Sequence, residues 1–260
     1  MRHPTHAPKQ WKRRSDHLRA LVLDLDGTII DTESALYDAW EEVYGRRGAV
    51  LPLEEWMRCV GTSPDAFDPY AYLEGLVGHR LDRRALEAEV EQAAAAHLAR
   101  LRPRDGVVAL VEAARREGLG LAVASSSGRP WVERFLEQAG LTAAIDVLAT
   151  ADDVARVKPA PDLYLLALGR LGVEASEALA VEDSPNGARA ALAAGLRCVV
   201  VPNPLTAGEV FPAEVPRLSS LRGRTPRALW ELARRRPQSL SSSSSSRSSS
   251  SNSSSSSSSS

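Results

Sequence analysis

The chain has 260 residues, 43% hydrophobic and 25% charged, which is the composition of an ordinary globular protein with one large or two smaller domains. No apolar stretch approaches the roughly 18 residues that a transmembrane helix needs, and residues 1–20 lack the apolar centre of a signal peptide. We therefore expect a soluble, cytoplasmic protein with no membrane partner. Cys59 and Cys198 are too few and too far apart for a disulfide framework, so we expect buried thiols.

The first 19 residues form a basic leader with six Lys or Arg residues and one Asp, although the net charge of the whole chain is only −1. Such a run can contact nucleic acid or an anionic surface. This one contains a single aromatic residue, Trp11, together with Pro4 and Pro8. We therefore expect residues 1–19 to be a disordered arm and expect no nucleic-acid partner.

The first expected element is an apolar strand in residues 21–25, which runs into a turn at Gly27. Helices are then expected in residues 34–44, 53–60 and 82–101, the last with the clearest 3.6-residue spacing of apolar side chains. Asp31 is expected to cap the first of these helices. From residue 107 onward strands and helices alternate. The expected strands cover residues 119–124, 146–149, 178–181 and 197–201, and the expected helices cover residues 107–117, 130–138, 161–171 and 188–194.

This alternation is typical of an α/β fold with a doubly wound parallel sheet and a Rossmann-like core. We assign residues 20–32 and 101–215 to that core, and residues 33–100 to an inserted helical cap domain. Residues 216–238 are expected to be weakly structured, with a weak helix at most. Residues 239–260 are almost entirely serine and are expected to be disordered, because serine cannot bury enough apolar area to offset the chain entropy.

Side chains that can carry chemistry follow the expected strands, where open α/β sheets bind their ligands. They are Asp24, Asp26, Ser125, Ser126, Ser127, Lys158, Glu182 and Asp183. Several carboxylates at one edge repel one another by on the order of 4 kcal/mol per close pair at an effective dielectric of 20. A Mg²⁺ ion relieves this repulsion and commonly binds through one or two carboxylates and a substrate phosphate. Lys158 is the only lysine after Lys12, which indicates a need for a compact ammonium there.

These residues stand in four ordered segments. The segments are residues 24–28 (DLDGT), residues 125–127 (SSS, called the serine loop), residues 158–162 (KPAPD) and residues 182–187 (EDSPNG). Together they resemble the four motifs of the haloacid dehalogenase superfamily, phosphatase branch, over roughly residues 20 to 205. The helical insertion is similar to the small cap of the β-phosphoglucomutase-like group.

The resemblance implies that Asp24 is the nucleophile and that an aspartyl-phosphate forms on it. It implies that Asp26 protonates the leaving alkoxide and then deprotonates the attacking water. The implied Mg²⁺ ligands are the Asp24 carboxylate, the Asp26 carbonyl, and Asp183, with Glu182 bound directly or in support.

The resemblance also implies that Ser125, the Ser126 N–H and Lys158 bind the transferring phosphoryl oxygens. The expected function is therefore Mg²⁺-dependent hydrolysis of a small phosphomonoester. The cap loop, residues 60–65, and nearby Trp56, Phe67 and Tyr70 are expected to shape a pocket, for instance for a sugar phosphate. Packing within the helical core is the alternative for these aromatic side chains.

Other functions were weighed against this one. Dehalogenases of this superfamily lack the second aspartate and the magnesium site, so the presence of Asp26 with Thr28 argues against dehalogenation. Phosphomutases of the group carry a cap histidine and a cap arginine, at positions where this chain has Leu36 and Pro64. A phosphomutase therefore ranks second, and a non-catalytic binding or regulatory protein third. The sequence leaves the oligomeric state open.

Overall fold

The computed structural model describes residues 17–58 and 67–235, and its centre is a five-stranded sheet in the order β3-β2-β1-β4-β5. Every pair of neighbouring strands is parallel. Strand β1 lies in the middle, with β2 and β3 on one side and β4 and β5 on the other. The strands are β1 (Ala20–Leu23), β2 (Gly120–Ala124), β3 (Val147–Ala149), β4 (Ala178–Glu182) and β5 (Arg197–Val200). The predicted α/β class with a doubly wound parallel sheet is confirmed.

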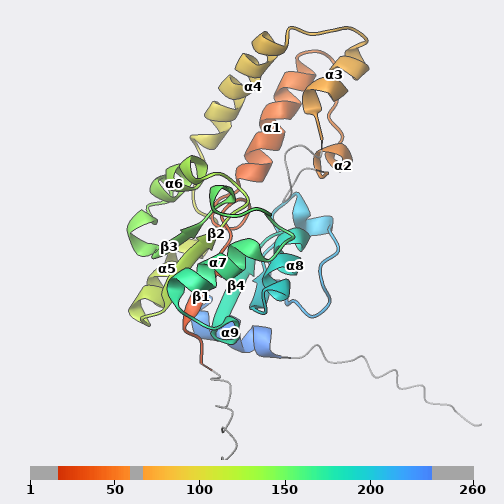
Figure 1. Cartoon of the computed structure of the whole chain (residues 1–260). Coiled ribbons are helices and arrows are strands. Elements are labelled where there is room, and N and C mark those ends of the chain that lie inside the picture. Colours follow the sequence, from red (N-terminus) through yellow and green to blue (C-terminus); the bar gives the residue numbers. More distant parts are fainter. Residues whose placement is uncertain (1–16, 59–66, 236–260) are drawn as a thin grey trace, which may run out of the picture.

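Both faces of the sheet are covered by helices, which explains why most residues of its strands are apolar (Figure 1). Leu21 and Leu23 belong to the hydrophobic cluster on one face, whereas Ala20 and Val22 belong to the cluster on the other. The first cluster includes residues of α5 (Val107–Arg116), α6 (Arg129–Gln138) and α9 (Pro226–Arg234). The second includes residues of α7 (Asp162–Leu171) and α8 (Pro185–Ala193). The core is thus divided into two layers by the sheet.

The helices that follow β1 and precede α5 form a separate group beyond the end of the sheet (Figure 1). They are α1 (Thr32–Gly45), α2 (Leu53–Trp56), α3 (Pro69–Val77) and α4 (Arg83–Leu98). Helix α1 packs along α4, and Asp31 caps α1 as predicted, accepting a hydrogen bond from Ser34 N at 3.1 Å. That this group acts as a cap domain stays a prediction.

Helix α3 was absent from the predicted elements, although its ends carry signals. Asp68 caps it by accepting from Tyr70 N (2.9 Å), and Gly78 ends it with φ 76°. Helix α2 has four residues and ends before residue 60, where the predicted helix ended. Residues 59–66 lie outside the described part of the chain, and Cys59 with them.

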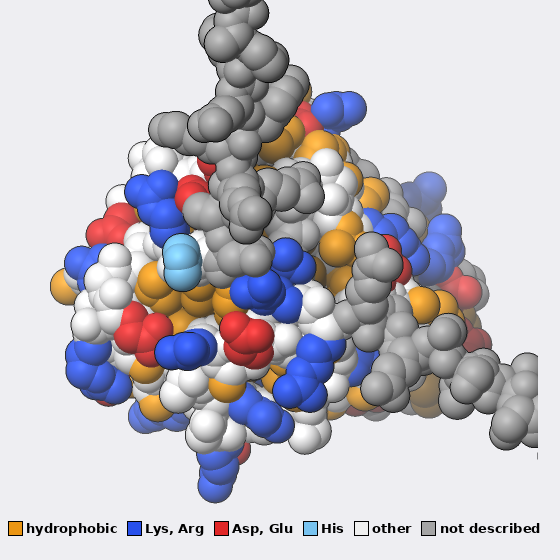
Figure 2. Space-filling model, turned by 90° about the horizontal axis from the view of Figure 1, so that it is seen from below, with side chains coloured by type: hydrophobic (Ala, Val, Ile, Leu, Met, Phe, Trp, Pro, Cys, Tyr) orange, Lys and Arg blue, Asp and Glu red, His pale blue; other side chains and the backbone are white. Residues whose placement is uncertain are grey.

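The C-terminal segment contains a helix that is better packed than the weak one expected within residues 216–238. In α9, Leu229 and Trp230 are buried against the core, and the Arg197 guanidinium lies 4.9 Å from the centre of the Trp230 ring. Figure 2 shows this end of the molecule, where basic and acidic side chains intermingle around apolar ones. None of the helices in the described ranges has the length and apolarity to cross a bilayer. The leader through residue 16 and the serine tail from residue 239 lie outside these ranges, while Cys198 is buried as expected.

Candidate active site

The site lies where three neighbouring parallel strands end. Asp24 follows β1, Ser125 follows β2, and Glu182 is the last residue of β4, with Asp183 next to it. The backbone N–H of Asp24 donates to Val181 O at 3.0 Å, so the ends of β1 and β4 are fixed to each other. Because strand order reverses on either side of β1, this edge is the topological switch point where open α/β sheets bind ligands.

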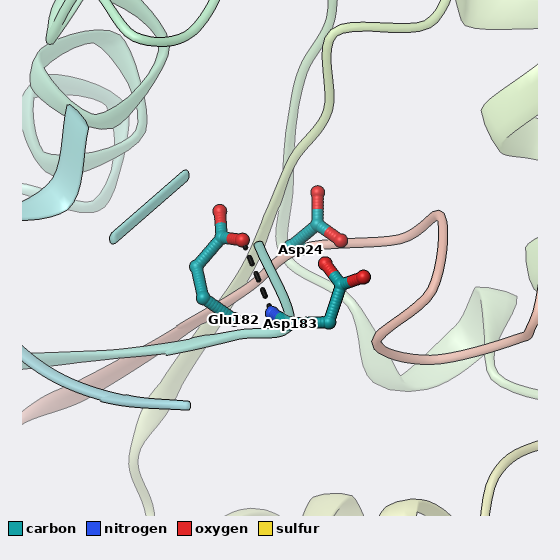
Figure 3. Close-up of side chains that lie close together, drawn as sticks. All are labelled: Asp24, Glu182 and Asp183. Atoms are coloured by element: carbon teal, nitrogen blue, oxygen red, sulfur yellow. Dashed lines mark hydrogen bonds between the residues drawn. The ribbon is translucent and has the colours of Figure 1, made fainter. Parts of the chain in front are cut away.

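Three carboxylates meet at this edge (Figure 3). One ligand atom from each of Asp24, Glu182 and Asp183 lies within 4.8 Å of the others, and all three side chains are buried. Gly187 leaves room for this group, since a Cβ there would lie 2.0 Å from the carboxyl carbon of Glu182. All three residues belong to the motifs identified in the sequence, and the structure brings them together.

Lys158 supplies the positive charge that faces the cluster. Its Nζ donates to Asp24 Oδ1 at 2.5 Å and to Glu182 Oε1 at 2.6 Å, and the side chain is 3% exposed. Burial by itself disfavours the ammonium, but the two carboxylates outweigh it and raise the pKa of Lys158. Tyr164 OH also donates to Glu182 Oε1, at 2.5 Å. One fixed cation thus stands against three buried carboxyl groups.

The excess of carboxyl groups over the single ammonium of Lys158 makes the cluster suitable for a divalent cation. Burial raises the pKa of Asp24 to about 7, against the opposing effect of Lys158, and burial together with Asp24 and Glu182 raises the pKa of Asp183 well above its ordinary value. Asp24 Oδ2 is buried and accepts no hydrogen bond from the described residues. Oxygen ligands of this kind fit a hard cation such as Mg²⁺, so the donor set and its unused oxygen match such an ion.

Because these carboxyl groups must lose their protons to bind a metal, we expect Mg²⁺ affinity to fall as the pH is lowered. With the pKa of Asp24 at about 7, the dissociation constant should rise roughly tenfold per pH unit below neutrality for each proton displaced. Isothermal titration calorimetry between about pH 8 and about pH 6 would measure this. A dissociation constant that does not change with pH would contradict it.

Asp26 is outside the cluster of three carboxylates, although its charge helps to raise the pKa of Asp24, and four side chains of the described residues donate to it. Thr32 Oγ1 and Trp131 Nε1 donate to its Oδ1, both at 2.7 Å, while Ser127 Oγ (2.7 Å) and Ser125 Oγ (3.2 Å) donate to its Oδ2. The sequence motif points to Asp26, but no sequence pattern predicts these contacts. The Trp131 indole comes from α6 and shows no sequence pattern that points to Asp26.

The serine loop after β2 connects this carboxylate to the sheet. Ser125 is fully buried, and its Oγ also accepts the backbone N–H of Ser127 at 3.0 Å. The hydroxyl of Ser126 is buried and has no hydrogen-bond partner among the described residues. Ser127 is thus part of the hydrogen-bonded group around Asp26, whereas the Ser126 hydroxyl is not.

The aromatic residues expected to shape a substrate pocket lie in the helical core. Trp56 and Phe67 are 6% and 7% exposed and belong to the main hydrophobic cluster. Tyr70 packs edge-on against Trp40, with ring centres 4.6 Å apart, and under the Arg83 guanidinium. The alternative of core packing therefore describes these side chains, and the cap loop at residues 60–65 is outside the described part.

We accordingly expect Trp56→Ala to act on stability. Removing a buried indole should lower the free energy of unfolding by about 3–5 kcal/mol. Urea denaturation would measure it, with Val50→Ala as control, since Val50 is 73% exposed and its truncation should change stability by less than about 0.5 kcal/mol. A stable Trp56→Ala protein with altered substrate preference would restore the pocket hypothesis.

Comparisons with known proteins converge on one group. A profile of haloacid dehalogenase-like hydrolases matches residues 18–195. YhcW of Bacillus subtilis (strain 168), named as a candidate phosphatase, is 42% identical over 204 residues, covering 78% of this chain and 92% of YhcW. The fructose-1-phosphate phosphatase YqaB of Escherichia coli (strain K12) is 34% identical over 183 residues, covering 70% of this chain and 95% of YqaB.

A solved structure has the same architecture. CbbY from Rhodobacter sphaeroides, in complex with xylulose-(1,5)bisphosphate, superposes with a TM-score of 0.65 at 30% sequence identity. The match covers 82% of this chain and 99% of that one. Similarity in fold and sequence therefore extends over both the sheet and the helices inserted after β1.

Proposed function

The chain belongs to the haloacid dehalogenase-like hydrolases, and from that premise we propose that it is a Mg²⁺-dependent phosphatase of small phosphomonoesters. The observation that carries the proposal is the buried group of Asp24, Glu182 and Asp183 facing Lys158. The carboxylates of this cluster suit a divalent cation, and the cation together with Lys158 can neutralise the negative charge of a phosphoryl group.

In the proposed reaction, a carboxylate oxygen of Asp24 attacks phosphorus, and the bond between phosphorus and the ester oxygen breaks. Asp26 gives its proton to the departing alkoxide. A water molecule then attacks the phosphorus of the aspartyl-phosphate, passes a proton to Asp26, and releases Asp24 and inorganic phosphate. The proton that left with the alcohol is thereby replaced, and the enzyme returns to its starting state.

Lys158 and the serine loop would stabilise the phosphoryl oxygens as charge develops on them. The hydroxyl of Ser126, which has no hydrogen-bond partner among the described residues, and the Ser126 N–H are suited to that role, whereas the N–H groups of Ser125 and Ser127 already donate within the protein. Mg²⁺, held by Asp24, Asp183, the Asp26 carbonyl and, directly or in support, Glu182, would supply further charge neutralisation. Lys158 also keeps Asp24 oriented, since it is bonded to Oδ1 and leaves Oδ2 without a partner.

The substrate class is proposed from the relatives. YqaB is named for fructose 1-phosphate, and CbbY is seen with xylulose-(1,5)bisphosphate, so sugar phosphates are the first class to test. A phosphomutase is the second candidate, since a Thermotoga maritima protein named as a candidate β-phosphoglucomutase is among the similar structures. It is disfavoured because Leu36, at the position of the mutases' cap histidine, is an apolar residue packed against the hydrophobic core.

The test is phosphate release from a panel of phosphomonoesters, with Mg²⁺ and with a chelator in its place. The panel should contain fructose 1-phosphate, a hexitol phosphate and xylulose 1,5-bisphosphate. Mg²⁺-dependent release from at least one ester supports the proposal. Formation of an isomeric phosphoester without phosphate release would favour the mutase, and no reaction by folded protein would overturn the phosphatase proposal.

A further inference from the structure

The segment that follows β5 is tied to the acidic cluster by buried polar contacts. Asn203 is 1% exposed, and its Nδ2 donates to Asp183 Oδ2 at 2.9 Å. The other half of the amide is engaged as well, because Asn203 Oδ1 accepts the backbone N–H groups of Leu205 and Thr206, each at 2.8 Å. Since only the amide oxygen can accept these two bonds, the NH₂ group must face Asp183.

Thr206 strengthens the same connection. It is fully buried, and its hydroxyl donates to the backbone carbonyl of Asp183 at 2.8 Å while accepting the N–H of Asn203 at 3.0 Å. The turn formed by residues 203–206 therefore contacts both the side chain and the main chain of Asp183. None of the four sequence segments that define the site includes this turn.

Arg104 links the turn to the loop that follows Asp24. Its guanidinium donates to the carbonyls of Val201 (2.7 Å) and Pro202 (2.8 Å) and also to the carbonyl of Gly27. Gly27 has φ 83°, and a Cβ there would lie 2.1 Å from Asp183 Oδ2 and 2.6 Å from Asn203 Nδ2. The loop backbone is thus packed directly against the contact between Asp183 and Asn203.

These contacts leave the two oxygens of Asp183 in different states. Oδ2 accepts a hydrogen bond from the amide of Asn203, whereas within the described residues the hydrogen bond to Oδ1 comes from Thr28 Oγ1 at 3.4 Å, which is long for a hydroxyl donor. A carboxylate with one oxygen held in this way presents the other in a fixed direction. Partners of metal ligands commonly act like this, and their loss typically weakens metal binding by 10- to 100-fold.

We propose that Asn203 is a positioning residue that holds Asp183 so that Oδ1 faces the cation, with Thr206 and Arg104 fixing the turn that carries it. The inference rests on the proposed metal site and deepens it. It assigns a function to a turn outside the family's four motifs, and it predicts that loss of the Asn203 amide changes metal affinity more than it changes the fold.

The experiment measures Mn²⁺ binding directly, from the electron paramagnetic resonance signal of free Mn²⁺, because Mn²⁺ prefers the same oxygen ligands as Mg²⁺. Wild-type protein is compared with Asn203→Ala and Asn203→Ser. A serine hydroxyl at this position can accept the backbone N–H groups of the turn but is too short to reach Asp183. We expect both variants to bind Mn²⁺ roughly 10- to 100-fold more weakly, with turnover at saturating Mg²⁺ within a few-fold of wild type.

Thr225→Ala is the matched control, since the Thr225 side chain accepts a backbone N–H as Asn203 does, that of Ala228 at 3.2 Å, but at the exposed start of α9. Its Mn²⁺ affinity should equal that of wild type. An Asn203→Ser protein with unchanged Mn²⁺ affinity would overturn the inference while leaving the metal site intact. A wild-type protein without saturable Mn²⁺ binding would overturn the metal site itself, and the inference with it.

Discussion

Asp24→Asn is expected to lose phosphatase turnover by at least about 10⁴-fold, because an amide cannot act as the nucleophile that forms the aspartyl-phosphate. The fold should be kept. Asn has nearly the shape of Asp, Lys158 keeps its contact with Glu182 at 2.6 Å, and one of three mutually repelling buried carboxyl groups is removed. Phosphate release at saturating Mg²⁺ measures the loss, and thermal unfolding of metal-free protein measures the stability.

The intermediate itself can be tested in the same experiment. Rapid acid quenching of wild-type protein with substrate, followed by intact mass measurement, should reveal one added phosphoryl group that the variant lacks. Asp105→Asn is the control, since Asp105 pairs with Arg222 on the surface and its side chain is 67% exposed. Residual turnover of Asp24→Asn near that of the control would sink the proposed chemistry.

The residues that could be predicted from sequence are those placed by the topology of the sheet. In a parallel sheet the carboxyl ends of neighbouring strands meet at one edge, so apolar strands followed by Asp24 and by Glu182 and Asp183 already imply a shared site. Lys158 could be identified because it is the only lysine beyond the leader. Its position between Asp24 and Glu182 agrees with the charge balance that the cluster needs.

The residues that could not be predicted make their contacts across long sequence distances. Trp131 donates to Asp26 over 105 residues, and Asn203 donates to Asp183 over 20 residues, without any periodicity that marks either side chain. Asp26 shows the same limit from the other direction. It is two residues from Asp24, but its carboxylate accepts hydrogen bonds from Ser127 of the serine loop and Trp131 of α6, which the spacing alone does not predict.

Replacing Lys158 by an uncharged residue should lower both the free energy of unfolding and the turnover. Lys158→Met keeps most of the side-chain volume but leaves Asp24 and Glu182 without their buried cation. Breaking a buried ion pair in this way costs about 3–5 kcal/mol, and losing a charge that stabilises the transferring phosphoryl group should also lower turnover by roughly 10²- to 10³-fold. Chemical denaturation of metal-free protein measures the first effect, and phosphate release measures the second.

The pH dependence separates this cause from a simple loss of packing. Lys158 lowers the pKa of Asp24, which burial raises to about 7, so the pKa must rise further in Lys158→Met. A carboxyl group whose pKa is raised in the folded state lowers the free energy of unfolding as the pH rises from its unfolded-state pKa to its folded-state pKa. The stability difference between wild type and variant should therefore be larger at about pH 9 than at about pH 6.

Arg156→Met is the control, because Arg156 is an exposed cation paired with Asp162, and its loss should cost less than about 1 kcal/mol. A difference that stays constant with pH would mean that Lys158 contributes packing alone, and the charge balance proposed for the site would be wrong.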